Sequence, residues 1–243
     1  MSKMISANTI AEVAGLFGDV ARASILTALM GGRALTAGEL ARLAGVTAQT
    51  ASGHLAKLLE TGLVAVEKQG RHRYYRLASA DVAEAMQALM VVAAAAPARH
   101  HPVGPRDKAL RLARTCYDHM AGRLAVALAD TLSDKGFISL AEGAGIVTDE
   151  GHRFFCDFGL ALAPAKKGSR PLCRTCLDWS ERRPHLGGRL GAELLSRCLD
   201  LGWVARMPEG RALSVSRKGE AGFSGLFGLP DGWQDEVTQP AGS

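Results

Sequence analysis

Apolar positions in residues 8–96 recur with the period of an α-helix in several separate segments. The pattern predicts helices over residues 8–17, 19–30, 36–43, 47–60 and 80–95. Residues 63–67 and 73–77 are instead typical of two short strands, joined by the basic tip 68–72. Two closely spaced helices followed by a hairpin predict a winged helix-turn-helix.

Capping residues fix the limits of the two central helices. Thr36 and Glu39 have the spacing of a capping box, which begins the first of them. A tight turn over residues 44–46 follows, Thr47 begins the second helix, and Gly62 ends it. The turn therefore joins two helices at the spacing of a DNA-reading pair.

The second of these helices carries hydrogen-bonding side chains on the face opposite its apolar stripe. Such a helix reads base edges in the major groove, while the cations of a neighbouring wing neutralise phosphates. The alternative is ordinary helix packing beside solvated hairpin arginines, and the basic wing makes that coincidence less favoured. The predicted DNA-binding residues are Thr47, Gln49, Thr50, Ser52, His54 and Lys57 on the helix, and Lys68, Arg71, His72 and Arg73 on the wing.

Residues 8–96 also resemble a known family. The carrying segments are Leu16–Leu26, Glu39–Ala41, Gly45–Thr47, Thr50–Leu55 and Thr61–Val64. They resemble the arsenical-resistance-regulator (ArsR) family of bacterial repressors. The resemblance implies a homodimer that binds double-stranded operator DNA, an imperfect palindrome, and releases it when an effector binds. The apolar helices predicted at both ends of this domain agree with pairing, although packing against the rest of the chain is the alternative.

The chain beyond residue 96 is organised differently. Residues 97–105 hold three prolines and predict a linker. Residues 119–137 match residues 185–203 at an offset of 66, which predicts two repeats at about 106–160 and 173–229. Each repeat is predicted as a long helix, a Gly-aromatic stop, a hairpin and a closing helix. Residues 230–243 are expected to form a flexible tail.

The fold class that follows is mainly α with small β-hairpins (α+β). An N-terminal winged helix-turn-helix domain over residues 1–96 precedes a C-terminal domain of two winged-helix-like repeats over residues 106–229. Neither repeat has a polar recognition helix, so an effector-sensing or scaffold role is expected for the C-terminal domain.

Candidate soft ligands gather in the C-terminal half. The pattern places two of them three residues apart on one predicted helix face, and two more form a C-x-x-C in a Pro-flanked loop. A thiophilic metal or metalloid ion is one interpretation, a redox thiol pair is a second, and an architectural role or an organic-effector pocket is a third. A shared zinc centre requires ligand atoms within roughly 5 Å of one another. The candidates are Cys116, His119, Cys173, Cys176 and His185.

Two departures from the family move any switch into the C-terminal domain. The resemblance implies metal ligands as a Cys-x-Cys in the first recognition-motif helix or as Asp and His on the last helix. Residues 39–43 hold no thiol, and residues 81–95 hold no His. The segments 113–119 and 176–183 resemble a subgroup of longer ArsR-like regulators, which supplies no effector.

Net charge, cysteine count and the length of apolar runs limit the classes of protein to which the chain can belong. A net charge of +5 and a pI near 9.1 allow DNA binding without requiring it. The odd count of five cysteines and the lack of a signal-like segment favour a cytoplasmic protein, and no apolar run predicts a membrane span. We expect a DNA-binding regulator and no enzyme. The alternatives are an enzyme using Cys116/His119 or Cys176/His185 as nucleophile and base, or a regulator with a scaffold domain.

Overall fold

The computed structural model describes residues 6–95, 105–141, 143–162, 170–208 and 210–235. By contact the chain divides into two compact units. The N-terminal unit comprises Met1–Met90 with Pro208–Arg211, and the C-terminal unit comprises Val91–Met207 with Ala212–Ser243. Each is described by itself.

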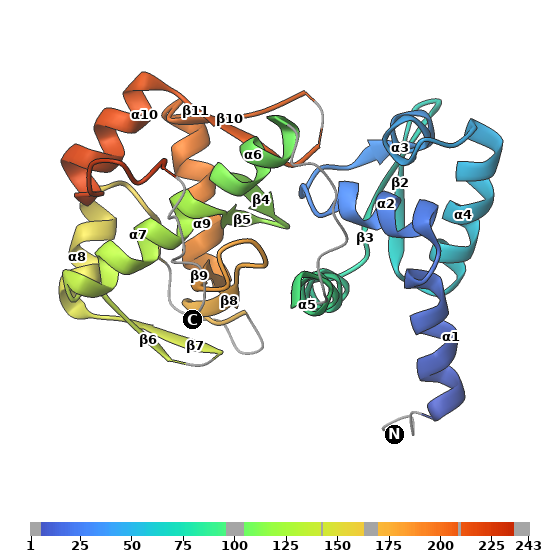
Figure 1. Ribbon diagram of the computed structural model, residues 1–243, viewed down its shortest axis with the longest axis horizontal. Helices are drawn as coiled ribbons and strands as arrows, with labels where there is room; N and C mark the ends of the chain where they lie inside the picture. Colours follow the sequence, from blue (N-terminus) through green and yellow to red (C-terminus); the bar gives the residue numbers. More distant parts are fainter. Residues whose placement is uncertain (1–5, 96–104, 142, 163–169, 209, 236–243) are drawn as a thin grey trace, which may run out of the picture. The chain divides into compact units, whose positions relative to one another are not determined.

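The N-terminal unit is a winged helix-turn-helix, as the sequence predicts. Its three strands form one antiparallel sheet in the order β1-β3-β2. The expected hairpin tip over 68–72 is shorter in the structure, because the strands pair up to Gln69 and His72. The elements are α1 (Ala7–Phe17), α2 (Val20–Leu29), β1 (Leu35–Thr36), α3 (Ala37–Ala44), α4 (Ala48–Glu60), β2 (Val64–Gln69), β3 (His72–Leu77) and α5 (Ala80–Ala95), as Figure 1 shows.

The helix limits have the causes expected from the sequence. The Thr36 hydroxyl accepts from the Glu39 amide, and the Glu39 carboxylate accepts from the Thr36 amide at 2.8 Å, so the capping box is present. Thr47 caps α4 by accepting from the Thr50 amide. Gly45 ends α3 with a φ of 68°, a conformation that favours glycine. These caps set where α3 begins and ends and where α4 begins.

One apolar core holds the helix-turn-helix together. It includes the fully buried Ile25 and Leu26 of α2, Leu40 of α3, and Leu55 and Leu58 of α4. Burial of such side chains contributes roughly 1.5–3 kcal/mol each. The opposite face of α4 is therefore left free to meet a partner.

The C-terminal unit contains two successive runs of hairpin, helix, hairpin and helix. The first run is β4 (Arg114–Cys116), β5 (His119–Ala121), α7 (Arg123–Asp134), β6 (Ile138–Ala141), β7 (Ala144–Val147) and α8 (Asp149–Asp157), preceded by α6 (Pro105–Leu112). The second run is β8 (Arg174–Leu177), β9 (Pro184–Gly187), α9 (Gly188–Asp200), β10 (Val204–Arg206), β11 (Leu213–Val215), α10 (Arg217–Gly222) and the π-helix η1 (Phe223–Phe227).

The two runs interlock through their first hairpins. Strand β5 lies against β9, while α9 packs on β5 and α7 packs on β9, an arrangement that can be followed in Figure 1. Equivalent hydrogen bonds also occur within each run. Thr148 and Ser216 each cap a helix and donate a hydroxyl proton to the carbonyl of Gly136 and Gly202, at 2.8 and 2.7 Å. A single apolar core joins both runs.

Glycines make the hairpin-to-helix turn possible in both runs. Gly122 and Gly188 have φ values of +87° and +76°, which side-chain-bearing residues rarely adopt. A Cβ would lie 2.7 Å from the Arg111 carbonyl oxygen at the first and 2.8 Å from the Pro171 carbonyl oxygen at the second. The sequence match at these positions thus has a physical cause in close backbone approach.

The long helix predicted in each repeat is present as α7 and α9, but the prediction was wrong for the residues before it, which form a hairpin. Residues 114–121 are a β-hairpin between α6 and α7, and residues 174–187 form the equivalent hairpin before α9. Tyr117 takes a φ of 61° in the tight turn, which a helix does not permit. Apolar spacing on such short strands cannot be told from helical spacing.

The ends of the expected domains also differ. Pro105 begins α6, and the rest of the expected linker over 97–105 lies outside the described residues. The expected tail over 230–243 was wrong in its first part, because Trp233 packs against the core with its ring 6.5 Å from that of Phe223. Residues 236–243 lie outside the described part of the chain. Burial of the large apolar area of its indole ring stabilises Trp233 against the core.

Candidate functional site

The solvent-facing side of α4 carries the expected recognition residues. Gln49 and Lys57 are exposed, and so are three hydroxyl-bearing residues whose side chains already have local partners. The Thr47 and Thr50 hydroxyls lie 2.8 Å apart, and the Ser52 hydroxyl donates to the Ala48 carbonyl at 2.8 Å. Gln49 and Lys57 are therefore the side chains on this face best placed to reach a ligand.

His54 differs from the other members of this set. It is half-buried, and its Nδ1 lies 3.8 Å from an Asp19 carboxylate oxygen at the start of α2. Hydrogen bonding to the Arg22 amide lowers the pKa of Asp19, and the nearby His54 acts in the same direction. His54 thus faces the α2–α4 contact more than the open side of α4.

The wing brings the basic residues to one hairpin. Lys68, Arg71, His72 and Arg73 are all exposed, and Lys68 and Arg73 are cross-strand partners in the β2–β3 ladder. The turn between the strands consists of Gly70, with a φ of +58°, and Arg71. Exposed cations on a hairpin next to a polar helix suit a phosphate backbone.

A second constellation lies inside the C-terminal unit. Cys116 and His119 are the last paired positions of the β4–β5 hairpin, and Cys176 and His185 are paired positions of the β8–β9 hairpin. One ligand atom from each of these residues lies within 4.8 Å of all the others. We call these four residues the Cys2His2 cluster. Both histidines and Cys116 are buried, and Cys176 is half-buried.

Cys173, the fifth candidate, lies apart from this cluster. It is buried in the apolar core, where an added Cβ on Gly145 would meet its Sγ at 2.5 Å. Burial raises the pKa of the Cys173 thiol to about 11. The C-x-x-C therefore does not act as a unit, because Cys173 lies in the apolar core just before β8, whereas Cys176 on β8 belongs to the cluster. Of the remaining thiols, Cys198 is buried as expected, whereas Cys156 is exposed, against the expectation of a core thiol.

Two carboxylates, Asp118 and Asp178, lie next to the cluster and bind its neighbours. Asp118 Oδ1 lies 3.1 Å from His119 Nδ1, and Asp118 also pairs with Arg170. Asp178 is fully buried and accepts from the Arg114 guanidinium at 2.8 Å and from the Gly122 amide at 2.7 Å. The Arg114 guanidinium in turn stacks 4.5 Å from the centre of the Trp179 ring. These bonds cross between the two runs and fix both hairpins.

The pKa shifts in the cluster favour a negative charge on Cys116 and a positive charge on His119. The hydrogen bond from Cys176 holds the pKa of Cys116 well below its usual range, despite burial, and the pKa of Cys176 is raised. Burial alone would lower the pKa of His119, but Cys116 and Asp118 raise it to about 9. Burial lowers the pKa of His185. The site thus stabilises a thiolate next to imidazole groups.

Sequence reasoning missed the full extent of the match between the two hairpins. Residues 114–118 and 174–178 share the pattern Arg-Thr-Cys-x-Asp at an offset of 60, whereas His119 and His185 match at 66. The second hairpin has a longer loop, and this insertion shifts the offset between its strands. An alignment that allowed a gap between the Cys and the His would have found both pairs.

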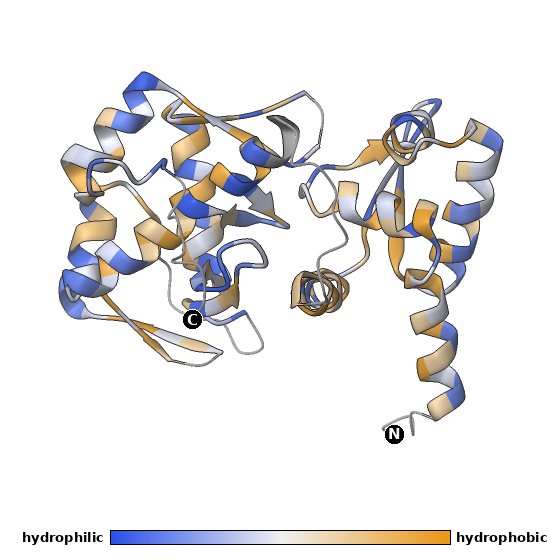
Figure 2. Cartoon of the chain, viewed as in Figure 1, coloured by the Kyte–Doolittle hydropathy of each residue, from blue (hydrophilic) through white to orange (hydrophobic). Residues whose placement is uncertain are grey.

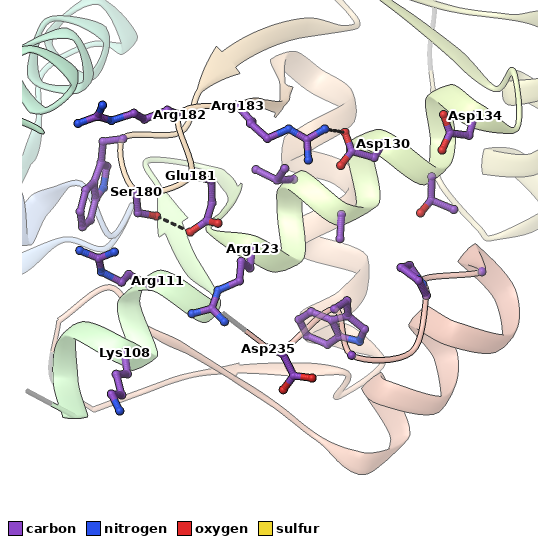
Figure 3. A pocket seen from close by; sticks show the side chains of 18 of the residues that line it. Lys108, Arg111, Arg123, Asp130, Asp134, Ser180, Glu181, Arg182, Arg183 and Asp235 are labelled. Carbon is purple, nitrogen blue, oxygen red and sulfur yellow. Dashed lines mark hydrogen bonds and ion pairs between the residues drawn. The ribbon is translucent and has the colours of Figure 1, made fainter. Parts of the chain in front are cut away.

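A wide charged groove runs along α7 in the same unit. Its lining includes the cationic residues Lys108, Arg111, Arg123, Arg182 and Arg183, with Asp130, Asp134, Glu181 and Asp235 among them. Figure 3 shows these residues around the groove, on α6, α7, the loop after β8 and the segment after η1, with Arg183 paired to Asp130. An open groove of mixed charge can take a polar, water-covered ligand.

The described helices include none that is long and apolar enough to cross a membrane.

The chain is similar in sequence to a helix-turn-helix domain family and to a bacterial transcriptional regulator. A family model described as a helix-turn-helix domain matches residues 17–67. The HTH-type transcriptional regulator YdfF of Bacillus subtilis (strain 168) is 44% identical over 214 residues, which cover 88% of this chain and 95% of that protein. The match therefore extends through most of the C-terminal unit.

Two solved structures are similar to the N-terminal part. A homodimeric winged helix-turn-helix DNA-binding domain of Mb0332 from Mycobacterium bovis, a possible ArsR-family regulator, is 29% identical, with a TM-score of 0.36. It covers 42% of this chain and 98% of its own. The transcriptional repressor BigR from Xylella fastidiosa is 27% identical, with a TM-score of 0.34, and covers 38% of this chain and 91% of its own.

Proposed function

This chain belongs to the helix-turn-helix transcriptional regulators, of the ArsR type that its recognition motif resembles, and we propose that it is a dimeric repressor whose C-terminal unit senses an effector. Two copies of α4 would then read the half-sites of an imperfectly palindromic operator.

One observation carries the DNA-binding part of the proposal. The exposed polar face of α4 and the exposed cations of the β2–β3 wing belong to the same compact unit. A helix of this kind suits the major groove, and a basic hairpin beside it suits the phosphates. Gln49 is the candidate for base contacts, and Arg71 and Arg73 for backbone contacts.

Exposed apolar surface supports the dimer. Helix α1 has no buried residue, and its Ile10 side chain is 60% exposed. Helix α5 leaves Leu89 and Val92 exposed at 46% and 69%, and Figure 2 shows how hydrophobic this helix is. Apolar helices of this kind are stabilised by burial against a second copy. Leu89→Glu should shift the mass measured by light scattering from dimer to monomer, whereas Glu84→Gln, which changes a charge of α5 but none of its apolar surface, should not.

Two observations favour an effector site in the C-terminal unit: the metal ligands of the family are missing from the N-terminal unit, and the C-terminal unit has a charged groove. Residues 39–43 on α3 hold no thiol, and α5 holds no histidine, so neither site that the family resemblance implies has its ligands. The groove along α7, lined by charged side chains, lies in the C-terminal unit and is the candidate effector site. A signal from that unit would act on operator affinity by favouring one arrangement of the dimer.

The test is a mobility-shift titration of the full chain on the DNA upstream of its own gene and on random duplex of equal length. The proposal expects tighter binding to the upstream DNA, and release by an effector among Zn(II), As(III), an oxidant or an organic anion. No binding to either duplex at low salt would overturn the DNA-binding role. Binding that none of these compounds changes would favour a scaffold role for the C-terminal unit.

A further inference from the structure

We propose that Cys116, His119, Cys176 and His185 bind one Zn²⁺ ion per chain in a closed tetrahedral site that joins the β4–β5 and β8–β9 hairpins. The inference depends on the cluster alone and stands whether or not the chain binds DNA.

The spacing of the ligand atoms fits a tetrahedral zinc centre. Zn–S bonds of about 2.3 Å at the tetrahedral angle place two sulfur atoms about 3.8 Å apart. The Sγ atoms of Cys116 and Cys176 lie 4.0 Å apart, and all four ligand atoms lie within 4.8 Å of one another. The two sulfur atoms are therefore within a few tenths of an ångström of the tetrahedral separation, and the other donor pairs need to close by no more than about 1–1.5 Å.

The histidines present nitrogens that other groups leave unsatisfied. Among the described residues, His119 Nε2 and both ring nitrogens of His185 are buried with no hydrogen-bond partner. A buried polar atom without a partner destabilises the fold, so such atoms usually mark a missing ligand or water. A metal bond to one nitrogen of each ring removes most of this destabilisation.

The surroundings orient the rings as a metal site requires. Asp118 Oδ1 faces His119 Nδ1 at 3.1 Å, which leaves Nε2 of that ring directed to the cluster. A carboxylate on the far nitrogen is the usual outer partner of a metal-binding histidine. Asp178 Oδ2 lies 3.8 Å from His185 Nδ1, on a carboxylate that also anchors Arg114. Both hairpins therefore supply a Cys, a His and an Asp.

The donor set selects the ion. Two thiolates and two neutral imidazoles balance the charge of one divalent cation, and this set is a usual structural zinc set. An arsenic(III) ion that takes three thiolates would find only two here, because Cys173 lies in the apolar core. Hard cations prefer oxygen ligands. The two sulfur atoms, 4.0 Å apart, are not joined in a disulfide, whose S–S bond is about 2.05 Å.

Four protein ligands leave no position for water or substrate, so the ion has a structural role. It would link strands from the two runs, whose cysteines are 60 residues apart in the chain. A bridge between distant segments restricts the unfolded chain and adds binding free energy to folding. The C-terminal unit should therefore lose stability when the ion is removed.

The first test is a metal analysis of the full chain, purified with a reductant and dialysed against metal-free buffer. We expect one zinc per chain, released when an organomercurial modifies the thiols. The Co²⁺-substituted protein should show the visible d–d bands of tetrahedral cobalt with a thiolate charge-transfer band. A chain with no zinc that also fails to take up Co²⁺ with these bands would overturn the proposal.

Variants test the ligand identity. Cys116→Ser and Cys176→Ser should each lower the zinc content and remove or alter the cobalt spectrum, whereas Cys156→Ser, at an exposed thiol, should leave both unchanged. Full zinc occupancy in the Cys116→Ser, Cys176→Ser double variant would overturn the assignment. If a variant fails to fold, zinc release from the unmodified chain by the organomercurial decides the question without it.

Discussion

Cys116 on β4 and Cys176 on β8 bring their sulfur atoms to 4.0 Å although 60 residues separate them in the chain. Each is the cross-strand partner of a histidine, His119 and His185, in its own hairpin. The C-terminal unit thus has a buried polar centre between its two runs, while the DNA-binding features of the chain lie in the other unit. We propose that the N-terminal unit recognises DNA and that zinc stabilises the fold of the C-terminal unit.

Removing a wing cation should weaken binding to every DNA sequence. Arg71→Ala removes an exposed charge at the hairpin tip, so affinity should fall on operator and random duplex alike. The slope of log K against log salt should decrease by about 1. Fluorescence anisotropy over a salt series measures both quantities. Arg153→Ala removes the same charge from an exposed position of α8 and serves as the control; equal effects from the two variants would contradict the role of the wing.

Shortening Gln49 should instead change base preference. Its side chain is exposed in the first turn of α4, where base contacts are made in this fold. Gln49→Ala should cost about 1–3 kcal/mol on the preferred sequence and little on random DNA. Competition binding with single-base operator variants measures this loss. Glu60→Ala, at the far end of α4, should leave the preference intact, and an equal loss on all sequences would refute a base contact by Gln49.

Two ion pairs of the C-terminal unit should differ sharply in their effect on stability. Arg114→Ala leaves the fully buried Asp178 without its main partner, which should lower the free energy of unfolding by about 3–5 kcal/mol. Arg183→Ala breaks the exposed pair with Asp130, which should cost about 0–1 kcal/mol. Chemical denaturation monitored by tryptophan fluorescence compares them. Similar losses from the two variants would show that burial does not set the strength of the Arg114 pair.

The capping box of α3 should make part of the stability of the N-terminal unit acid-sensitive. Hydrogen bonds from the Thr36 amide and hydroxyl lower the pKa of Glu39 below its ordinary 4.5. Because the folded pKa is the lower one, the carboxylate stabilises the fold above pH 4.5, and this contribution is lost as the pH falls through the folded pKa.

Glu39→Gln should therefore destabilise the unit by about 1 kcal/mol at neutral pH. The difference from the unmodified chain should shrink when the same unfolding measurement is made below pH 4.5. Glu60→Gln removes a carboxylate that takes no part in the cap and provides the comparison. A difference that stays constant with pH would mean that the Glu39 charge does not support the cap.

The N-terminal unit could be predicted from sequence because its signals are local. The Thr36–Glu39 capping box, the Thr47 cap and Gly62 bracket two helices with apolar stripes, and the structure has those helices within one or two residues. The wing followed from two short strands and a glycine between them. Each of these features is decided within a few residues of chain, so no long-range contact was needed to infer it.

The C-terminal hairpins could not be inferred in the same way. Residues 114–121 carry apolar residues whose spacing suits a helix as well as two three-residue strands. Each hairpin has its own ladder, β4 with β5 and β8 with β9, and the packing of β5 against β9 comes from residues 66 positions away in the chain. Cys116 and His119 were correctly singled out as neighbours, but they are neighbours across a turn and not along a helix.

The most direct test of the central claim is selection of bound sequences from a random duplex library by the full-length chain. We expect an enriched, imperfectly palindromic motif whose half-sites lie about one helical turn, or a multiple of it, apart. We also expect that Gln49→Ala relaxes specific positions of that motif while Arg71→Ala retains the motif at lower affinity. A library that shows no enrichment after repeated selection at moderate salt would contradict the assignment of this chain as a sequence-specific regulator.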